Sequence, residues 1–193
     1  MMVTQYQTGR RHLLKSPTIV LILVNLIFYV ITSIGGEDYL ILLSQVGGLF
    51  YQGFYWQIFT SLFIHFGILH LLFNMYGLFY FGRLNEMNFS VGRYLAIYFG
   101  SGLLGNVMSL ILIPPNVPAG GASGAIFGLL GSYVSIERRA NNMFMGLLFA
   151  FLIFVQSSGP GVNIFAHLFG LLAGLALGFL FAFTRRRAAH PYG

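Results

Sequence analysis

Six long apolar stretches constrain this chain more strongly than any other feature of its sequence. None of them contains Asp, Glu, Lys or Arg, and they comprise residues 19–34, 61–81, 94–113, 123–136, 143–155 and 163–184. Charged residues make up only 7% of the chain, whereas a soluble domain carries about 25%. Because apolar stretches close to 20 residues long are typical of membrane-spanning helices, we predict an all-α polytopic membrane protein with a bundle of six transmembrane helices.

The positions of the ten basic residues predict how this bundle is oriented. They lie only in the N-terminal tail (1–16), in the segments 82–93 and 137–142, and in the basic C-terminal tail (185–193). Basic residues concentrate on the cytoplasmic side of a membrane, so we expect a single domain over 1–193 in the cell membrane, with both termini cytoplasmic. Nucleic acid is not an expected partner, because the basic residues are divided among four short segments without interleaved aromatic residues.

The fourth stretch is too short to cross a membrane. At 1.5 Å per residue it would form a helix of roughly 21 Å, whereas the hydrocarbon core is about 30 Å thick. We therefore expect this helix to begin inside the membrane at Ser123, in the sequence Gly121-Ala122-Ser123-Gly124, with segment 114–122 dipping in to meet it. Irregular backbone at that depth is tolerated only when it is buried in protein or lines a water-filled cavity. Ser123 is thus predicted to face a wet pocket; the alternative is a helix N-cap serine that opens a small-residue packing face.

Three histidines lie within the apolar stretches, and ionisable residues inside a membrane are functional candidates by default. His167 lies near the start of the sixth stretch. Glycines follow it at helical spacing, and two more lie in the fourth stretch: Gly170, Gly174 and Gly178, and Gly124 and Gly128. Small residues let helices pack closely, so if these faces meet, Ser123 and His167 lie at the same depth as a nucleophile and its base. The alternative for His167 is a hydrogen bond between helices.

His70 and Asn74 lie four residues apart in the second stretch and therefore share one helical face. Their side-chain N–H groups could together hold a developing oxyanion. His65, five residues before His70, points in another direction and is expected to brace the segment before the helix. The alternatives are hydrogen bonds between helices or a metal site. A metal site is not expected, because no cysteine or carboxylate lies within any apolar stretch.

Together these features resemble the rhomboid intramembrane serine proteases in their minimal six-helix bacterial form, over residues 19–183. The matching motifs occur in the family order: Trp56, the set His65, His70 and Asn74, then Gly82, Arg83 and Glu86, then Gly121-Ala122-Ser123-Gly124, and His167. The resemblance implies a single rhomboid peptidase domain and a serine-type endopeptidase that needs no cofactor or metal. Its expected partners are transmembrane protein substrates, cleaved near the outer face, and membrane lipids.

The resemblance also implies a role for each matching residue. Ser123 is the expected nucleophile and His167 the general base and acid. The side chains of His70 and Asn74 and the backbone N–H of Ser123 are expected to stabilise the oxyanion. The supporting positions are Gly121, Phe127 and His65. No acidic residue lies in an apolar stretch, so no carboxylate is expected to orient His167 as in a catalytic triad.

Two residues depart from the family pattern. Phe127 lies four residues after the serine, where the family has an aromatic residue, usually tyrosine; it can stack but cannot donate a hydrogen bond. Gln57 follows Trp56 where the family has arginine. Two other kinds of protein are alternatives. One is a rhomboid-like pseudoprotease that binds membrane clients without cutting them. The other is a small transporter with the three histidines as a proton relay, which would usually need carboxylates in its spans.

Overall fold

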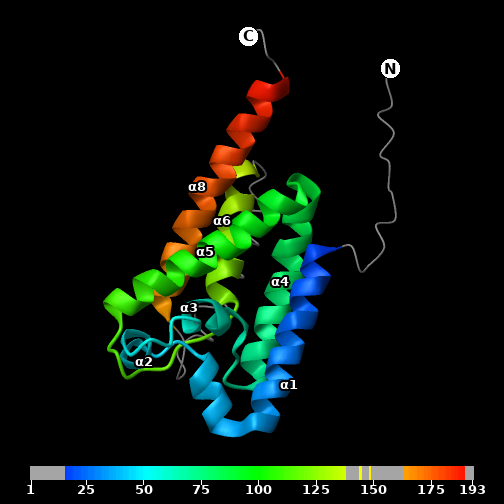
Figure 1. The fold of residues 1–193 in the computed structure, drawn as a ribbon. Coiled ribbons are helices and arrows are strands. Elements are labelled where there is room, and N and C mark those ends of the chain that lie inside the picture. The colour runs from blue at the N-terminus through cyan, green and yellow to red at the C-terminus, as the bar shows by residue number, and fades with distance from the viewer. Residues whose placement is uncertain (1–15, 138–143, 145–147, 149–162, 190–193) are drawn as a thin grey trace.

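The structure, a computed structural model, describes residues 16–137, 144, 148 and 163–189 (Figure 1). Its helices in chain order are α1 (Pro17–Leu43), α2 (Gly47–Tyr51), α3 (Gln57–Thr60), the 3₁₀ helix η2 (Ser61–Phe63), α4 (Ile68–Asn88), α5 (Val91–Leu112), α6 (Ser123–Ile136) and α8 (Ile164–Ala189). The described residues form no β-strand, so the prediction of an all-α protein is confirmed for this part of the chain.

Three of these helices are long and apolar enough to cross a membrane, namely α1, α5 and α8. A fourth candidate consists of α3 and η2 together with α4, which are bent by 89° relative to each other. The helix α6 is apolar but has only 14 residues, and its bounds are those that the sequence predicts. The count of six helices stays a prediction, because the fifth stretch, 143–155, lies outside the described residues except for Phe144 and Leu148.

The helix ends are arranged so that the described basic residues lie away from Ser123. In Figure 1 the start of α1, the end of α4, the start of α5 and the ends of α6 and α8 lie at one end of the bundle. Contacts agree with this view, since Arg93 in the first turn of α5 donates to the Phe181 carbonyl of α8 at 3.4 Å. This arrangement agrees with the alternation predicted from the basic residues; which end faces the cytoplasm stays a prediction.

The first predicted span and loop are partly wrong. We expected a helix over 19–34 and a loop over 35–56, but α1 continues to Leu43 with a break at Gly36. Gly36 has a φ of 71°, a left-handed conformation that glycine adopts at little cost, so the chain bends there and the helix resumes beyond it. A further short helix, α2, lies within the expected loop, and α3 follows directly after that loop.

The second predicted span is displaced along the chain. We expected a helix over 61–81, whereas α4 begins only after Gly67 and ends at Asn88. The helix continues into the segment 82–93, which was expected to be a loop, and polar side chains there have partners on other helices. For example, Asn85 donates from Nδ2 to the Leu129 carbonyl of α6 at 2.8 Å. Polarity in this segment therefore reflects contacts between helices rather than a loop.

The helices α6 and α8 pack through their glycines, as the sequence predicts. A methyl group on Gly170 would overlap the Gly124 carbonyl, and one on Gly174 would overlap the Gly128 carbonyl. Close backbone packing of this kind is what joins helices in lipid, where apolar side chains gain nothing by leaving one apolar environment for another. The contact also fixes how far α6 can slide along α8.

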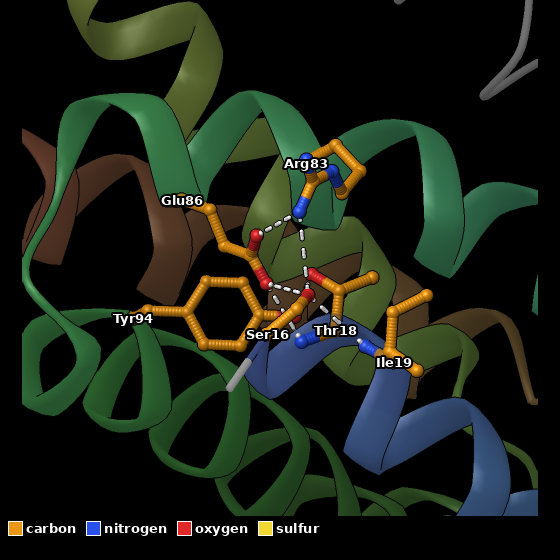
Figure 2. Close-up of polar contacts among 6 residues, drawn as sticks. All are labelled: Ser16, Thr18, Ile19, Arg83, Glu86 and Tyr94. Atoms are coloured by element: carbon orange, nitrogen blue, oxygen red, sulfur yellow. Dashed lines mark hydrogen bonds and ion pairs between the residues drawn. The ribbon is translucent and has the colours of Figure 1, made fainter. Parts of the chain in front are cut away.

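A cluster of polar side chains, here called the polar clamp, joins the start of α1 to the end of α4 (Figure 2). The Oε1 atom of Glu86 accepts hydrogen bonds from the Ser16 hydroxyl at 2.6 Å and from the Thr18 N–H at 2.8 Å. Its Oε2 atom pairs with Arg83 at 2.6 Å. The Thr18 hydroxyl donates to the Tyr94 hydroxyl of α5 at 3.1 Å. The carboxylate thus satisfies one backbone donor, the Thr18 N–H, at the N-terminus of α1, where the helix dipole favours negative charge.

The segment before α6 is buried against the segment after α1. Gln45 and Ala119 exchange two backbone hydrogen bonds of 2.8 and 2.9 Å and form an isolated β-bridge. Two residues further on, the N–H of Gly121 donates to the Ser61 carbonyl at 2.9 Å. The irregular backbone that leads to Ser123 therefore finds its partners inside the protein, as non-helical backbone at membrane depth requires.

Candidate active site

A short contact between Ser123 and His167 joins the start of α6 to α8. The Nε2 atom of His167 lies 2.7 Å from the Oγ atom of Ser123. Both residues are buried, with 7% of Ser123 and 3% of His167 exposed. Nε2 can accept the serine proton only in the tautomer that carries the ring hydrogen on Nδ1. The structure thus brings together the two residues that the sequence pairs, and their roles in catalysis stay a prediction, as does a wet pocket in front of the serine.

The position of Ser123 depends on Gly121, two residues earlier. Gly121 has a φ of 131°, which favours glycine. A Cβ atom at this position would lie 2.9 Å from Nε2 of His70 and 3.5 Å from Oγ of Ser123. The His70 ring and the serine hydroxyl therefore border the same small volume, which only a glycine leaves free. Because Ser123 is the first residue of α6, the backbone N–H groups of this turn have no partner within the helix.

One contact with its ring and one cap on its helix position His167. Phe127, one turn after Ser123 on α6, stacks on it with centroids 4.6 Å apart and an angle of 12° between the planes, which confirms the predicted stacking. Asn163 caps the start of α8, because its Oδ1 atom accepts from the N–H groups of Phe165 at 3.0 Å and Ala166 at 3.1 Å. The Nδ1 atom of His167 is buried and has no hydrogen-bond partner among the described residues.

His70 and Asn74 have different surroundings in the structure, although the sequence predicts the same role for both. His70 reaches the volume beside Gly121. The Nδ2 atom of Asn74 donates to the backbone carbonyl of His70 at 2.9 Å, so one of its N–H groups is used within its own helix. Its Oδ1 atom is buried without a partner among the described residues. A role for the Asn74 amide at the oxyanion therefore depends on its second N–H group.

The position expected for His65 is wrong. We expected it on α4, facing away from His70, but it precedes the helix and its ring meets the edge of the His70 ring, with centroids 5.0 Å apart. Its Nδ1 atom lies 3.2 Å from the Phe63 carbonyl, and Nε2 is buried without a partner in the described part of the chain. His65 therefore packs against a candidate site residue.

Sequence reasoning did not predict the structural roles of two buried polar residues, Asn163 and Gln57. Asn163 also donates from Nδ2 to the Ser109 hydroxyl of α5; an Asn before an apolar stretch is an N-cap signal that could have identified it. Gln57 is fully buried. Its Oε1 atom accepts from the Val46 N–H at 3.0 Å and its Nε2 atom donates to the Ile41 carbonyl at 3.0 Å, so it holds the segment between α1 and α2. No sequence signal predicts these partners.

Within the described residues, no three His, Asp or Glu side chains gather into a set that could hold a metal ion.

The fold and this site define an α-helical membrane protein with a buried serine–histidine pair at a helix start. The family model of the Rhomboid domain matches residues 52–183. This chain belongs to the rhomboid family.

Similarity to individual proteins agrees with this family. The chain is 36% identical over 137 residues to the rhomboid relative YdcA of Bacillus subtilis, an alignment that covers 67% of this chain and 68% of YdcA. It is 36% identical over 102 residues to the rhomboid protease GluP of the same organism, covering 53% of this chain and 20% of GluP. It is 37% identical over 135 residues to RHOMBOID-like protein 1 of Arabidopsis thaliana, covering 65% of this chain and 34% of that protein. The chain thus matches only a minor part of the last two relatives.

Proposed function

We propose that this protein is an intramembrane serine endopeptidase that cleaves transmembrane segments of other membrane proteins. The observation that carries the proposal is the 2.7 Å contact between Ser123 Oγ and His167 Nε2. Its membership of the rhomboid family and its similarity to GluP, which is named as a protease, support the same conclusion. A serine beside a neutral imidazole is the nucleophile–base pair of acyl transfer.

In the proposed reaction, Nε2 of His167 takes the proton from the Ser123 hydroxyl as Oγ attacks the scissile carbonyl. The tetrahedral intermediate then expels the amine, which receives that proton from His167, and an acyl-enzyme remains on Ser123. Water attacks the acyl-enzyme, His167 again takes a proton, and the ester bond to Oγ breaks as the proton returns to the serine. The reaction consumes one water and needs no cofactor.

His167 would be oriented by packing instead of by a carboxylate. Stacking on Phe127 and the cap from Asn163 restrict the ring and its helix. The imidazolium that forms during attack would lack an ion-pair partner among the described residues, because Nδ1 faces none. We therefore infer a dyad of Ser123 and His167.

The negative charge of the intermediate would be held at the start of α6. The backbone N–H of Ser123, the positive end of the helix dipole and the ring of His70 beside Gly121 favour an anion there. Asn74 would add its second N–H group. We further propose that both termini lie in the cytoplasm of the cell and that cleavage occurs near the outer face, because the described basic residues concentrate at the end of the bundle opposite Ser123. One peptidase domain would then extend over 1–193.

The test is cleavage of a model transmembrane substrate in proteoliposomes. Ser123→Ala and His167→Ala should each abolish cleavage, and the double variant should be no worse, because nucleophile and base act as one unit. Ser101→Ala is the matched control: its hydroxyl is fully buried but has no partner among the described residues, so activity should persist. Purified Ser123→Ala protein that still cuts at the wild-type site would exclude the dyad.

A second measurement separates the proposal from its alternatives. A fluorophosphonate probe should label Ser123 in the wild-type protein and leave His167→Ala unlabelled, while EDTA leaves activity unchanged. A pseudoprotease would bind the substrate but show neither labelling nor cleavage. A histidine-relay transporter would move protons across sealed vesicles, independently of Ser123. Reporter fusions at both termini test the topology, and an external C-terminus would contradict it.

A further inference from the structure

An apolar groove of about 520 Å³ lies between α1 and α5, away from the candidate active site. One wall is a face of α1 that includes Val20 and Val24, and the other is a face of α5 that includes Leu95. Phenylalanines close one end of the groove: the rings of Phe28 and Phe63 lie 5.2 Å apart, and those of Phe63 and Phe99 lie 6.5 Å apart. The groove is therefore closed at the end where these phenylalanines lie.

The length of the groove matches one leaflet of a bilayer. It extends along α1 from Pro17 to Phe28, about 16 Å at 1.5 Å per residue. Half of a hydrocarbon core is about 15 Å. Because the phenylalanine contacts close the far end, a flexible apolar chain that fills the groove would end there and extend back to the start of α1. Those dimensions exclude a second transmembrane helix, which needs the full thickness and a width of about 10 Å.

The open end of the groove lies at the starts of α1 and α5, and the guanidinium of Arg83, which pairs with Glu86, lies 3.4 Å from the Ser16 hydroxyl beside it. Pro17 and Val91, which line the groove there, stand at the starts of α1 and α5. The first turn of α5 leaves its N–H groups without partners in the helix, and its N-cap, Ser90, makes no side-chain cap hydrogen bond. In the polar clamp the Arg83 side chain is 50% exposed, whereas that of Glu86 is 6% exposed, so the cation is presented and the carboxylate is covered (Figure 2). Such a site suits a phosphate group.

We propose that this groove binds one phospholipid of the leaflet in which α1 begins. One acyl chain lies between α1 and α5, with its end at the phenylalanines, and the phosphate lies at the open end of the groove beside Pro17 and Val91. The occupant has to be apolar over one leaflet and anionic at the interface, and a phospholipid combines these properties. The bound lipid fills the space between two helices and holds α1 against the bundle. The proposal does not depend on proteolysis.

The first experiment measures lipid binding to delipidated protein by native mass spectrometry. Phosphatidylglycerol should bind as one retained molecule per chain, and diacylglycerol with the same acyl chains should bind about fivefold more weakly, because one nearby basic charge contributes about 1 kcal/mol towards an anionic lipid. Val20→Trp, which fills the groove, should lose the retained lipid. Leu23→Trp is the matched control on α1, since Leu23 and Val20 are equally exposed (44% and 43%) but Leu23 does not line the groove.

A second experiment uses the unmodified protein and so does not depend on how the variants fold. Phosphatidylglycerol with a photoreactive acyl chain should crosslink to groove residues such as Val24, Leu95 and Phe99. Adducts spread evenly over other exposed positions such as Leu23 would overturn the proposal, and so would equal binding of diacylglycerol or unchanged binding by Val20→Trp. Lipid binding that appears only after deletion of residues 1–15 would also overturn it, because the tail would then be the occupant.

Discussion

Two helix contacts in this protein are built in opposite ways. Between α6 and α8, backbone meets backbone at glycines, and no side chain lies between Gly128 and Gly174. Between α1 and α4, the polar clamp joins the helices through side-chain hydrogen bonds to Glu86. Side chains can change rotamer to accommodate small shifts. A glycine contact has no such freedom, so it determines the relative position of two helices more strictly.

The two contacts position different parts of the molecule. The glycine contact sets the relative height of α6 and α8 and thereby the 2.7 Å separation between Ser123 and His167. The polar clamp holds α1, which contains none of the candidate site residues. Changes in the first contact should therefore alter the reaction, and changes in the second should alter mainly stability.

The largest effect is expected for Gly174→Ala. The added methyl group overlaps the Gly128 carbonyl, so α8 has to move away from α6. A misplacement of about 1 Å costs about 10²-fold in rate, and overpacking costs about 1–3 kcal/mol in stability. Cleavage in proteoliposomes and a thermal melt would measure both. Gly100→Ala is the control, because its new methyl group would meet only the end of the Leu177 side chain at 3.4 Å. Full activity of Gly174→Ala would show that the glycine contact does not determine the geometry of the site more strictly than the polar clamp does.

The next effect concerns α4, which contains both Glu86 of the polar clamp and the candidate site residues His70 and Asn74. His70→Ala should lower kcat by up to about 10²–10³ with little change in KM, because an oxyanion donor acts only as charge develops. Asn74→Ala should cost less, since one of its N–H groups already binds the His70 carbonyl. Kinetics in detergent would be compared with a melt of each variant. If both variants melt far below the wild type and regain full rate at low temperature, these side chains are structural braces.

A smaller effect, on stability alone, is expected in the polar clamp. Glu86→Ala removes the acceptor for Ser16 and Thr18, which should lower the free energy of unfolding by about 1–3 kcal/mol and leave kcat within about twofold. Glu86→Gln keeps one acceptor oxygen and should lose less. The measurement is thermal unfolding beside a cleavage assay. A Glu86→Ala variant with normal melting but a strongly reduced rate would show that the clamp serves the site.

The smallest effect is expected for Asn163→Ala, which removes the cap of α8. Loss of an N-cap costs about 1 kcal/mol, and because Asn163 lies one turn before His167, a rate loss of a few fold should accompany it. Asn163→Asp keeps the capping oxygen and should recover most of the stability. If Asn163→Ala lowers the rate as much as Gly174→Ala, the position of His167 depends on side-chain bonds as much as on glycines.

Sequence reasoning was most accurate where local patterns determine the structure. The bounds of α6 follow from prolines and glycines before it and Glu137 after it, and the glycine spacing on α6 and α8 predicted their contact. The predicted position of His65 was wrong, because the helical periodicity was extended back through Gly67, where the helix α4 begins. A continuous apolar stretch does not reveal where a helix begins inside it.

Sequence reasoning also failed where polar residues have distant partners. Asn85 and Glu86 indicated a loop, yet Asn85 binds the Leu129 carbonyl of α6 and Glu86 binds the start of α1. Gln57 is buried for a similar reason. A single sequence shows that such residues are polar, but not which groups satisfy them, so it cannot distinguish a buried connection from an exposed loop.

The position of α8 as the last described helix bears on protein synthesis. A growing chain emerges from its N-terminus at about 5–20 residues per second, so Ser123 is made before His167. The glycine face of α6 meets its partner only once α8 has been inserted. Under the proposed function, a nascent or stalled chain that ends before α8 would carry the nucleophile without its base. The protein would thus be inert while these helices are being inserted beside other membrane proteins, and the insertion of α8 would switch it on.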